Sequence, residues 1–130
     1  MFKEAHIYLR SANILFVNTI ESYTFGTIII DGEEISHDLI IYPDRLDTSW
    51  WRVQGHSLAI EDLREALEYG PDVLIVGTGA NGRMRFPDET QEHIRSCGIE
   101  LIITDTGHAC EVYNELKDEK NTVAVLHLTC

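Results

Sequence analysis

Residues 73–82 read Val-Leu-Ile-Val-Gly-Thr-Gly-Ala-Asn-Gly. The four apolar residues at the start favour a strand that is covered on both faces, because such strands carry no alternating polar positions. The glycines that follow form a G-x-G-x-x-G motif directly after this strand. In open α/β sheets, ligands bind outside the carboxyl ends of the strands. This stretch therefore predicts an α/β fold and directs the search for a site to one edge of its sheet.

Residues 59–130 alternate between helical and strand patterns. Ile60, Leu63 and Leu67 lie on one face of a helix, which Ser57 is suited to cap and Gly70-Pro71 to end. The other elements expected are a helix from Pro87 to just before Gly98, a strand over residues 99–104, a helix capped by Thr106 and a strand over residues 122–128. The order α-β-α-β-α-β predicts parallel strands with right-handed crossovers.

Residues 1–58 predict an N-terminal antiparallel β-meander. Residues 24–30 (Thr-Phe-Gly-Thr-Ile-Ile-Ile) favour a strand, and Asp31-Gly32 after them is a hairpin signal because the turn needs positive φ. Return strands are expected within residues 33–42 and another strand within 48–53, while the apolar piece ending at Phe16 and Val17 has no assigned type. The prediction is a single α/β domain, 1–130, with a β-rich part (1–58), an α/β part (59–130) and a mixed, largely parallel central sheet.

Composition and charge exclude several classes of function. The 22 acidic and 10 basic residues give a net charge of −12, and such a field repels the phosphates of nucleic acids. No apolar run reaches the roughly 18 residues that a membrane span needs. Three cysteines, an odd number without a Cys-x-x-Cys pair, favour a reducing compartment. We therefore expect a soluble, cytoplasmic protein that binds neither nucleic acid nor membrane.

The glycine-rich loop, residues 77–82, has three interpretations. Its spacing matches the dinucleotide fingerprint, and Asp105 lies 23 positions after Gly82, where an acid could bind a ribose. However, residues 83–87 separate the loop from the next helix, and Pro87 is better placed to begin that helix. The loop is then either a turn that needs glycine for its backbone alone or a site for another anion, held with Arg83 or Arg85.

The same edge of the predicted sheet carries further polar residues. His108 and Cys110 lie at the start of the third helix, His127 lies at the end of the last strand, and Cys130 follows it. Their spacing matches no zinc module, so we predict neither a metal site nor a cofactor. The candidate ligand-binding residues at this edge are Gly77, Gly79, Asn81, Gly82, Arg83, Asp105, His108, His127 and Cys130.

A second candidate surface lies at Trp50, Trp51 and Arg52. Neighbouring residues of a strand point to opposite faces, so only one of the two indoles can enter a one-sided core. The other either packs on a neighbouring element or meets a partner, since tryptophan and arginine are enriched at interface anchors. We therefore consider these three residues as an interaction surface.

No catalytic residue is predicted. The chain contains neither a G-x-S-x-G nor a His-Glu-x-x-His pattern. The acids Glu61, Asp62, Glu65 and Glu68 are interpreted as the solvated face of a helix.

The order of several motifs resembles a known family. They are Phe25-Gly26-x-Ile28-x-Ile30-x-Gly32, His37-Asp38, Ser49-Trp50-Trp51-Arg52 with His56, Leu74-Ile75-Val76-Gly77-Thr78-Gly79, Gly82-Arg83-Met84, Tyr113-Asn114-x-Leu116 and His127-Leu128-Thr129-Cys130. Over roughly residues 21–130 the chain is similar to the uncharacterised family of the adipogenesis-associated domain protein, which is distantly related to mitochondrial complex I assembly factor three. The resemblance implies a three-layer α/β fold with a β-meander, and no established activity, cofactor or catalytic residue.

The functional hypothesis follows from these observations. The missing catalytic pattern and the resemblance together favour a non-catalytic module that binds a protein partner or a small ligand, with homo-oligomer formation left open. The alternative is an enzyme or sensor that binds a small anionic ligand, a phosphate or a nucleotide, at residues 77–82.

Overall fold

The computed structural model describes residues 7–10, 13–16 and 18–130. In chain order its elements are β1 (Ile7–Arg10), β2 (Asn13–Phe16), β3 (Ile20–Thr24), β4 (Thr27–Ile30), β5 (Glu33–Ile35), β6 (Leu39–Tyr42), β7 (Arg45–Asp47), the 3-10 helix η2 (Ile60–Leu63), α1 (Arg64–Glu68), β8 (Val73–Gly77), α2 (Asp88–Ser96), β9 (Glu100–Thr104), α3 (Thr106–Leu116) and β10 (Thr122–Leu126). Among the described residues, no helix is long and apolar enough to cross a membrane. Val17 lies outside the described residues.

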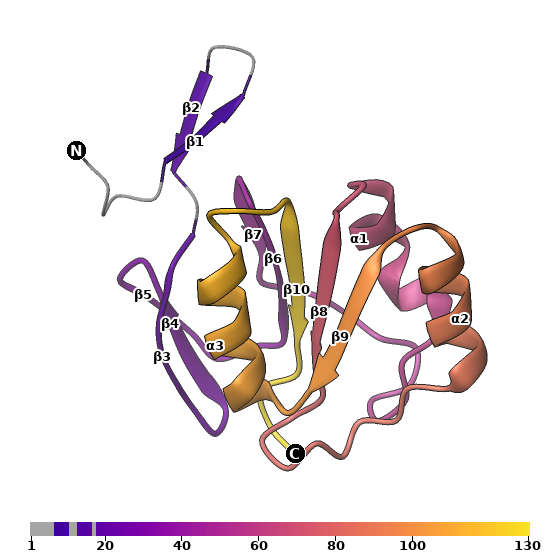
Figure 1. Ribbon diagram of the computed structural model, residues 1–130. Helices are drawn as coiled ribbons and strands as arrows, with labels where there is room; N and C mark the ends of the chain where they lie inside the picture. The colour runs from indigo at the N-terminus through magenta and orange to yellow at the C-terminus, as the bar shows by residue number, and fades with distance from the viewer. Residues whose placement is uncertain (1–6, 11–12, 17) are drawn as a thin grey trace.

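The central sheet has the strand order β7-β6-β10-β8-β9 (Figure 1). Strands β8, β9 and β10 pair in parallel, as the alternation of helices and strands predicts, whereas β6 pairs with β10 antiparallel. Every residue of β8 and β10 is buried, which fits strands that are covered on both faces. The sheet is therefore mixed, with its parallel half built from the second part of the chain.

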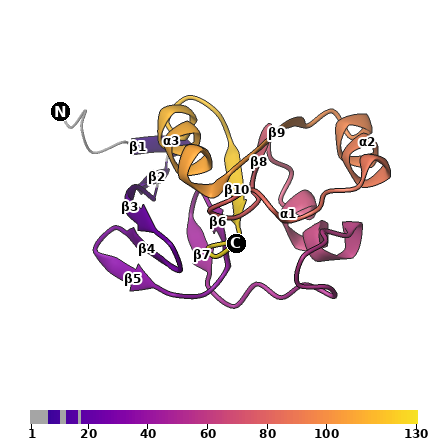
Figure 2. The same ribbon diagram turned by 90° about the horizontal axis from the view of Figure 1, so that it is seen from below.

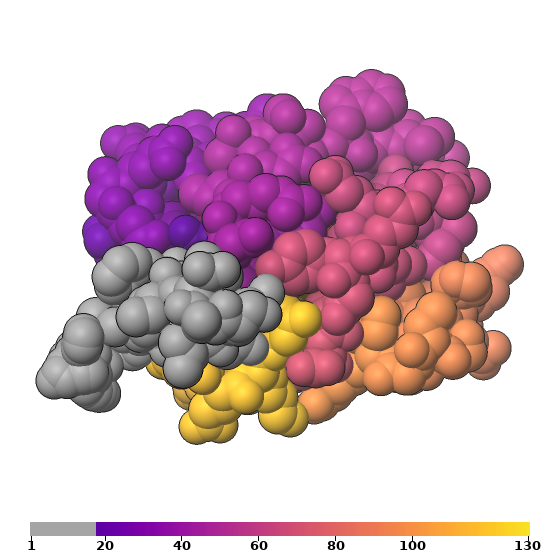
Figure 3. Space-filling view, turned by 90° about the horizontal axis from the view of Figure 1, so that it is seen from above, coloured from indigo at the N-terminus to yellow at the C-terminus, as the bar shows by residue number. Residues whose placement is uncertain are grey.

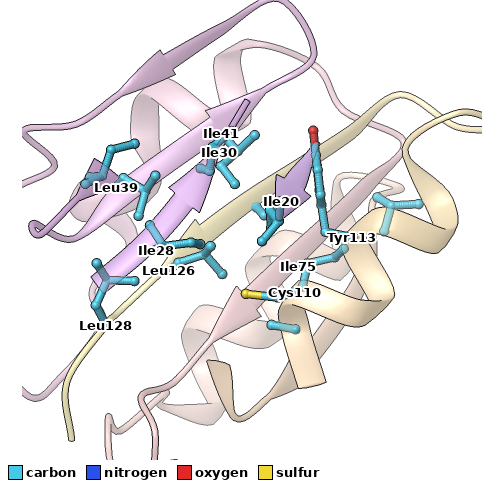
Figure 4. Packing of buried hydrophobic residues seen from close by; sticks show 14 residues of the cluster. Ile20, Ile28, Ile30, Leu39, Ile41, Ile75, Cys110, Tyr113, Leu126 and Leu128 are labelled. Atoms are coloured by element: carbon cyan, nitrogen blue, oxygen red, sulfur yellow. The ribbon is translucent and has the colours of Figure 1, made fainter. Parts of the chain in front are cut away.

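Two outer layers enclose this sheet, so the fold has three layers (Figures 1 and 2). On one face, α3 and the three-stranded sheet β3-β4-β5 pack on alternate residues of the central strands, including Ile75 and Leu126. On the other face, η2, α1 and α2 pack on the remaining residues, including Val76 and Val125. Figure 4 shows the first of these two clusters, in which Tyr113 of α3 lies across from the isoleucines of the meander. The three-layer architecture is thus confirmed.

The meander contains two tight turns, of which the sequence predicted one. Asp31 and Gly32 have φ values of 49° and 85°, so the hairpin predicted there is confirmed. The single strand predicted over residues 24–30 is wrong, because a second turn at Phe25-Gly26 separates β3 from β4. Gly26 has a φ of 83°, and its N–H donates to the Leu128 carbonyl at 2.8 Å. The two parts of the chain pack directly on each other (Figure 3).

Two helix starts differ from the prediction. The first helix opens as the 3-10 turn η2 after Ala59, so Ser57 does not cap it. The third helix is capped by Asp105, while Thr106 is its first residue. The second helix begins as predicted, with Pro87 at its N-cap position and Asp88 as its first residue.

Candidate functional site

The carboxyl ends of the parallel strands bring the predicted site residues to one edge of the sheet. Strand β8 leads into the glycine loop, β9 into Asp105 and β10 into His127. The loop and the end of the chain are in direct contact, because the Ala80 N–H donates to the Thr129 carbonyl at 2.7 Å. The structure therefore brings these segments together at one edge, as predicted.

The glycine loop uses most of its N–H groups inside the chain. The Gly79 N–H donates to the Thr106 hydroxyl at 2.8 Å, that of Thr78 to the Thr104 carbonyl at 2.9 Å, and that of Gly82 to the Gly79 carbonyl at 3.1 Å. In dinucleotide folds such N–H groups and the start of the next helix face the phosphates. Here α2 begins only at Asp88, so the arrangement differs from that fingerprint.

Glycine at position 79 has a structural reason. A Cβ atom there would lie 2.6 Å from the Cys130 carbonyl oxygen and 2.7 Å from that of Thr129. At Gly77 it would lie 2.9 Å from both a methyl of Leu126 and the hydroxyl of Thr106. The close approach that a pyrophosphate would need is therefore used by the protein's own chain.

The other polar candidates at this edge point to different surroundings. One carboxylate oxygen of Asp105 accepts the His108 N–H at 2.9 Å, so this acid caps α3. His108 is exposed and faces Glu111 at 3.6 Å. Cys110 is buried in the core, and burial raises the pKa of its thiol to about 12. Asn81 and Arg83 are exposed and Cys130 is half-buried, and the described residues contain no group of three His, Cys, Asp or Glu placed to hold a metal ion.

A buried polar cluster joins three residues that are distant in sequence, and we call Asp38, Arg52 and His127 the Asp38 cluster. One carboxylate oxygen of Asp38 accepts from the Arg52 guanidinium at 2.7 Å and lies 2.8 Å from His127 Nδ1. The other accepts the Leu128 N–H at 2.8 Å. The side chains of Arg52 and His127 are only 8% and 6% exposed, so this cluster is a charged structure within the fold.

The protonation of the cluster follows from its geometry. Because Nδ1 of His127 faces a carboxylate oxygen, this nitrogen carries a proton. Its Nε2 is buried and has no hydrogen-bond partner among the described residues. Burial alone would raise the pKa of Asp38, but the hydrogen bonds from His127, Leu128 and Arg52 outweigh it and lower the pKa to about 2. The carboxylate is therefore ionised at neutral pH.

The Asp38 cluster holds one side of residues 48–57, which we call the Trp51 loop. Arg52 also donates through Nε and a terminal nitrogen to the Gly55 carbonyl, at 3.2 and 2.8 Å. On the other side, Asp62 accepts the N–H groups of Val53 and Ala59, at 3.0 and 2.8 Å. Asp62 is 8% exposed, so its interpretation as a solvated helix residue is wrong: it organises this loop.

The predicted strand over residues 48–53 is also wrong, because strand β7 ends at Asp47 and the Trp51 loop is irregular. Even so, one tryptophan enters the core and the other does not. Trp50 is 5% exposed and donates from its indole N–H to the Asp62 carbonyl at 2.9 Å. Trp51 is 77% exposed. The two indoles therefore differ in exposure because of the hydrogen bonds of the loop, and not because neighbouring residues of a strand point to opposite faces.

An open pocket of about 520 Å³ lies above the Asp38 cluster. It is lined by Gly26, Ser36, His37, Asp38, Trp50, Trp51, Arg52, Val53, Gly55, Leu128 and Thr129. The large apolar side chains exposed among the described residues are Phe25 (60%), Trp51 (77%) and Val53 (66%). Two of them line this pocket and the third adjoins its Gly26. We call these three residues the apolar rim.

The lowered pKa of Asp38 predicts how stability changes in acid. A carboxyl with a pKa of about 2 in the folded protein and 3.8 unfolded adds stability above pH 3.8, and this stability is lost as the pH falls through 2. The difference in free energy of unfolding between wild type and Asp38→Asn should therefore shrink as the pH falls from about 4 to about 2. Urea titrations across this range measure it, and a difference that stays constant would contradict the ionised cluster.

Comparisons with known proteins place the chain among relatives. The model of the family described as "Protein of unknown function (DUF498/DUF598)" matches residues 20–127. The chain is 32% identical over 108 residues to NADH dehydrogenase (ubiquinone) 1 alpha subcomplex assembly factor 3 of Danio rerio. That match covers 81% of this chain and 60% of the relative, so the chain spans about three fifths of the relative's length. The predicted relation to this assembly factor is confirmed.

Solved structures support the same grouping. A conserved hypothetical protein from Pyrococcus horikoshii is 33% identical, with a TM-score of 0.76, over 86% of this chain and 99% of that one. A protein from Bordetella parapertussis is 27% identical, with a TM-score of 0.69, over 85% of this chain and 94% of that one. Since the family model covers most of the sequence and the folds agree, the chain belongs to the DUF498/DUF598 family of proteins of unknown function.

Proposed function

We propose that this chain is a non-catalytic protein-binding module whose contact surface is the apolar rim, with Trp51 at its centre. The observation that carries the proposal is the 77% exposure of Trp51 on a loop held by partly buried hydrogen bonds. Burying an exposed tryptophan is a common source of binding energy at interfaces, where this residue is enriched among hot spots. The rim is thus suited to anchor a partner.

The order of the Trp51 loop supports this proposal. Ordering a mobile loop on binding costs free energy, which reduces affinity. Here Arg52 and Asp62 already hold the loop through hydrogen bonds to Gly55 and Val53, and Asp62 also accepts the N–H of Ala59 just after the loop. A partner would therefore meet a preorganised surface. An indole that served only to fill the fold would be buried, as that of Trp50 is.

The relatives give indirect support. The Danio rerio relative is named an assembly factor, and an assembly factor acts on other protein subunits. We extend to this chain only that general mode, protein binding, because the match covers 60% of the relative.

The alternative, an enzyme or sensor that binds a phosphate or nucleotide at residues 77–82, has weaker support. The N–H groups of Thr78, Gly79, Ala80 and Gly82 already donate within the chain. The exposed Arg83 remains a candidate for an anion contact. Titration with inorganic phosphate and nucleotides, followed by NMR shifts of the loop amides, tests this alternative independently of the rim.

Site-specific photo-crosslinking tests the protein-binding proposal. A photoreactive phenylalanine at position 51 should form discrete crosslinks in cells of the native host, whereas the same group in place of Glu115, exposed on α3 across the sheet, should not. The captured protein is then purified and its affinity measured by calorimetry. Trp51→Ala should weaken binding by roughly 30-fold, as for a hot spot worth about 2 kcal/mol. Equal affinity for wild type and Trp51→Ala would refute the proposal.

A further inference from the structure

The segment that builds the pocket carries a strong excess of negative charge. Residues 20–62 contain nine acids and two bases. The acids are Glu21, Asp31, Glu33, Glu34, Asp38, Asp44, Asp47, Glu61 and Asp62, and the bases are Arg45 and Arg52. If the net charge of −12 were spread evenly along the 130 residues, this segment would carry a smaller excess of acids than it does. This excess of acids favours a partner of opposite charge for the segment.

Both positive side chains in this segment are already engaged. Arg52 is buried against Asp38 at 2.7 Å. The guanidinium of Arg45 lies 4.0 Å from the ring centre of Tyr42 and pairs with Asp44 and Glu65 at 3.6 and 3.7 Å. The lysines and the other arginines of the chain lie outside residues 20–62. These two bases pair with Asp38 and Asp44, so seven of the nine acids have no arginine or lysine of this segment to balance their charge.

Two exposed acids, Glu34 and Glu61, lie near residues that line the pocket or belong to the rim. Glu34 lies two positions before Ser36, which lines the pocket, and is exposed. Glu61 is exposed and, together with Val53, lines the neighbouring hollow of about 730 Å³. Charge and apolar area therefore occur together at this surface.

The aromatic residues of the rim add to the attraction for cations. The face of an aromatic ring carries negative electrostatic potential, so a cation over an exposed tryptophan gains roughly 0.5–1 kcal/mol. The same loop already shows such a pair on its inner side, where the Arg52 guanidinium lies 4.9 Å from the centre of the Trp50 ring. Trp51, 77% exposed, offers the equivalent ring to solvent.

We infer that the partner contacts the rim through a basic polypeptide segment, which places an arginine or lysine side chain on the ring of Trp51. This inference rests on the proposed protein-binding function and adds the chemistry of the partner. Charge complementarity favours this occupant over the others. A second copy of the chain would bring another net charge of −12 to the surface, and nucleic acid would bring phosphates, so both are repelled.

Two synthetic peptides provide the test: a 12-residue alternating glycine-arginine peptide and its glycine-glutamate counterpart. Fluorescence anisotropy of the labelled peptides should show saturable binding of the first and none of the second. Trp51→Ala should weaken binding of the arginine peptide by about fivefold, in line with one cation–π contact. Trp51→Phe should lie between, and Glu115→Gln, which changes charge away from the rim, should bind like wild type.

The outcomes separate this inference from the function on which it rests. If the arginine peptide binds Trp51→Ala as tightly as wild type, its binding reflects diffuse charge and the inference is wrong. Binding of both peptides alike would overturn it as well. Crosslinking at position 51 can still succeed after either of these results. The protein-binding function would then stand, and a basic contact segment would be excluded. Melting temperatures of all variants are measured alongside, to check that each variant is folded.

Discussion

Replacing Gly79 by alanine is expected to lower the free energy of unfolding by about 3–5 kcal/mol. Gly79 has a φ of 110°, a conformation that residues with a Cβ rarely adopt. The added methyl would also lie 2.6 and 2.7 Å from the carbonyl oxygens of Cys130 and Thr129. These are backbone atoms, so no side-chain rotation can relieve the contact.

The expected magnitude combines two costs. A left-handed conformation costs a residue other than glycine roughly 1–2 kcal/mol, and forcing extra volume into a packed region costs typically about 1–3 kcal/mol. The second cost is at the upper end here, because moving residues 129–130 would break the hydrogen bond from Ala80 to Thr129. The fold, and not only a local loop, should therefore lose stability.

Gly98→Ala is the matched control for this prediction. Gly98 has a φ of 83°, but a Cβ there would have no atom within 4 Å. Urea unfolding of both variants should give a loss of about 1 kcal/mol for Gly98→Ala, the conformational cost alone. If Gly79→Ala loses no more than this, residues 129 and 130 do not lie against the loop.

Because Gly79→Ala is expected to destabilise the whole fold, a loss of ligand binding in this variant would not show that the loop binds the ligand.

The elements that sequence reasoning predicted correctly are those with local signals. The strand Val73–Gly77 follows from its apolar run, the hairpin from Asp31-Gly32, and the start of α2 from Pro87. Each of these signals depends on a few neighbouring residues, whose backbone preferences or burial decide the structure. The second turn, at Gly26, was missed because its N–H bonds to Leu128, a partner more than one hundred positions away.

The Asp38 cluster shows the same limit at the candidate site. His127 was a candidate from its position at the end of β10, and Arg52 from its tryptophan neighbours, but Asp38 entered only through the family motif. Asp38 and His127 meet because Leu39 of β6 pairs with Leu126 of β10 in an antiparallel register. The sequence pattern predicted parallel strands only in the second half, so nothing local indicated that these two residues, 89 positions apart, would share a hydrogen bond.

Replacing Asp38 by asparagine is the second change for which we expect a large effect, a loss of about 3 kcal/mol in the free energy of unfolding. Asparagine keeps an oxygen for the Leu128 N–H, but it removes the charge that faces Arg52 and His127. Removing one partner of a buried ion pair costs about 3–5 kcal/mol, because the other charge is left buried. Asp38 is 17% exposed, which places the expected loss at the lower end.

An exposed arginine–carboxylate pair provides the control. Arg45 and Glu65 lie 3.7 Å apart with side chains 48% and 63% exposed, so Glu65→Gln should cost less than about 1 kcal/mol. The double variant Asp38→Asn/Arg52→Met should regain part of the loss, since it removes both charges. If urea unfolding shows equal losses for Asp38→Asn and Glu65→Gln, the cluster is not a buried ion pair.

The same variant connects the cluster to binding. Without the carboxylate, Arg52 loses its short contact with Asp38, and the Trp51 loop keeps mainly the hydrogen bonds to Asp62. Near-ultraviolet circular dichroism should then report a less ordered tryptophan environment. Affinity for the captured partner should fall even though the apolar rim is unchanged, because binding must now order the loop. Unchanged affinity in a destabilised Asp38→Asn protein would show that the Trp51 loop is held without the cluster.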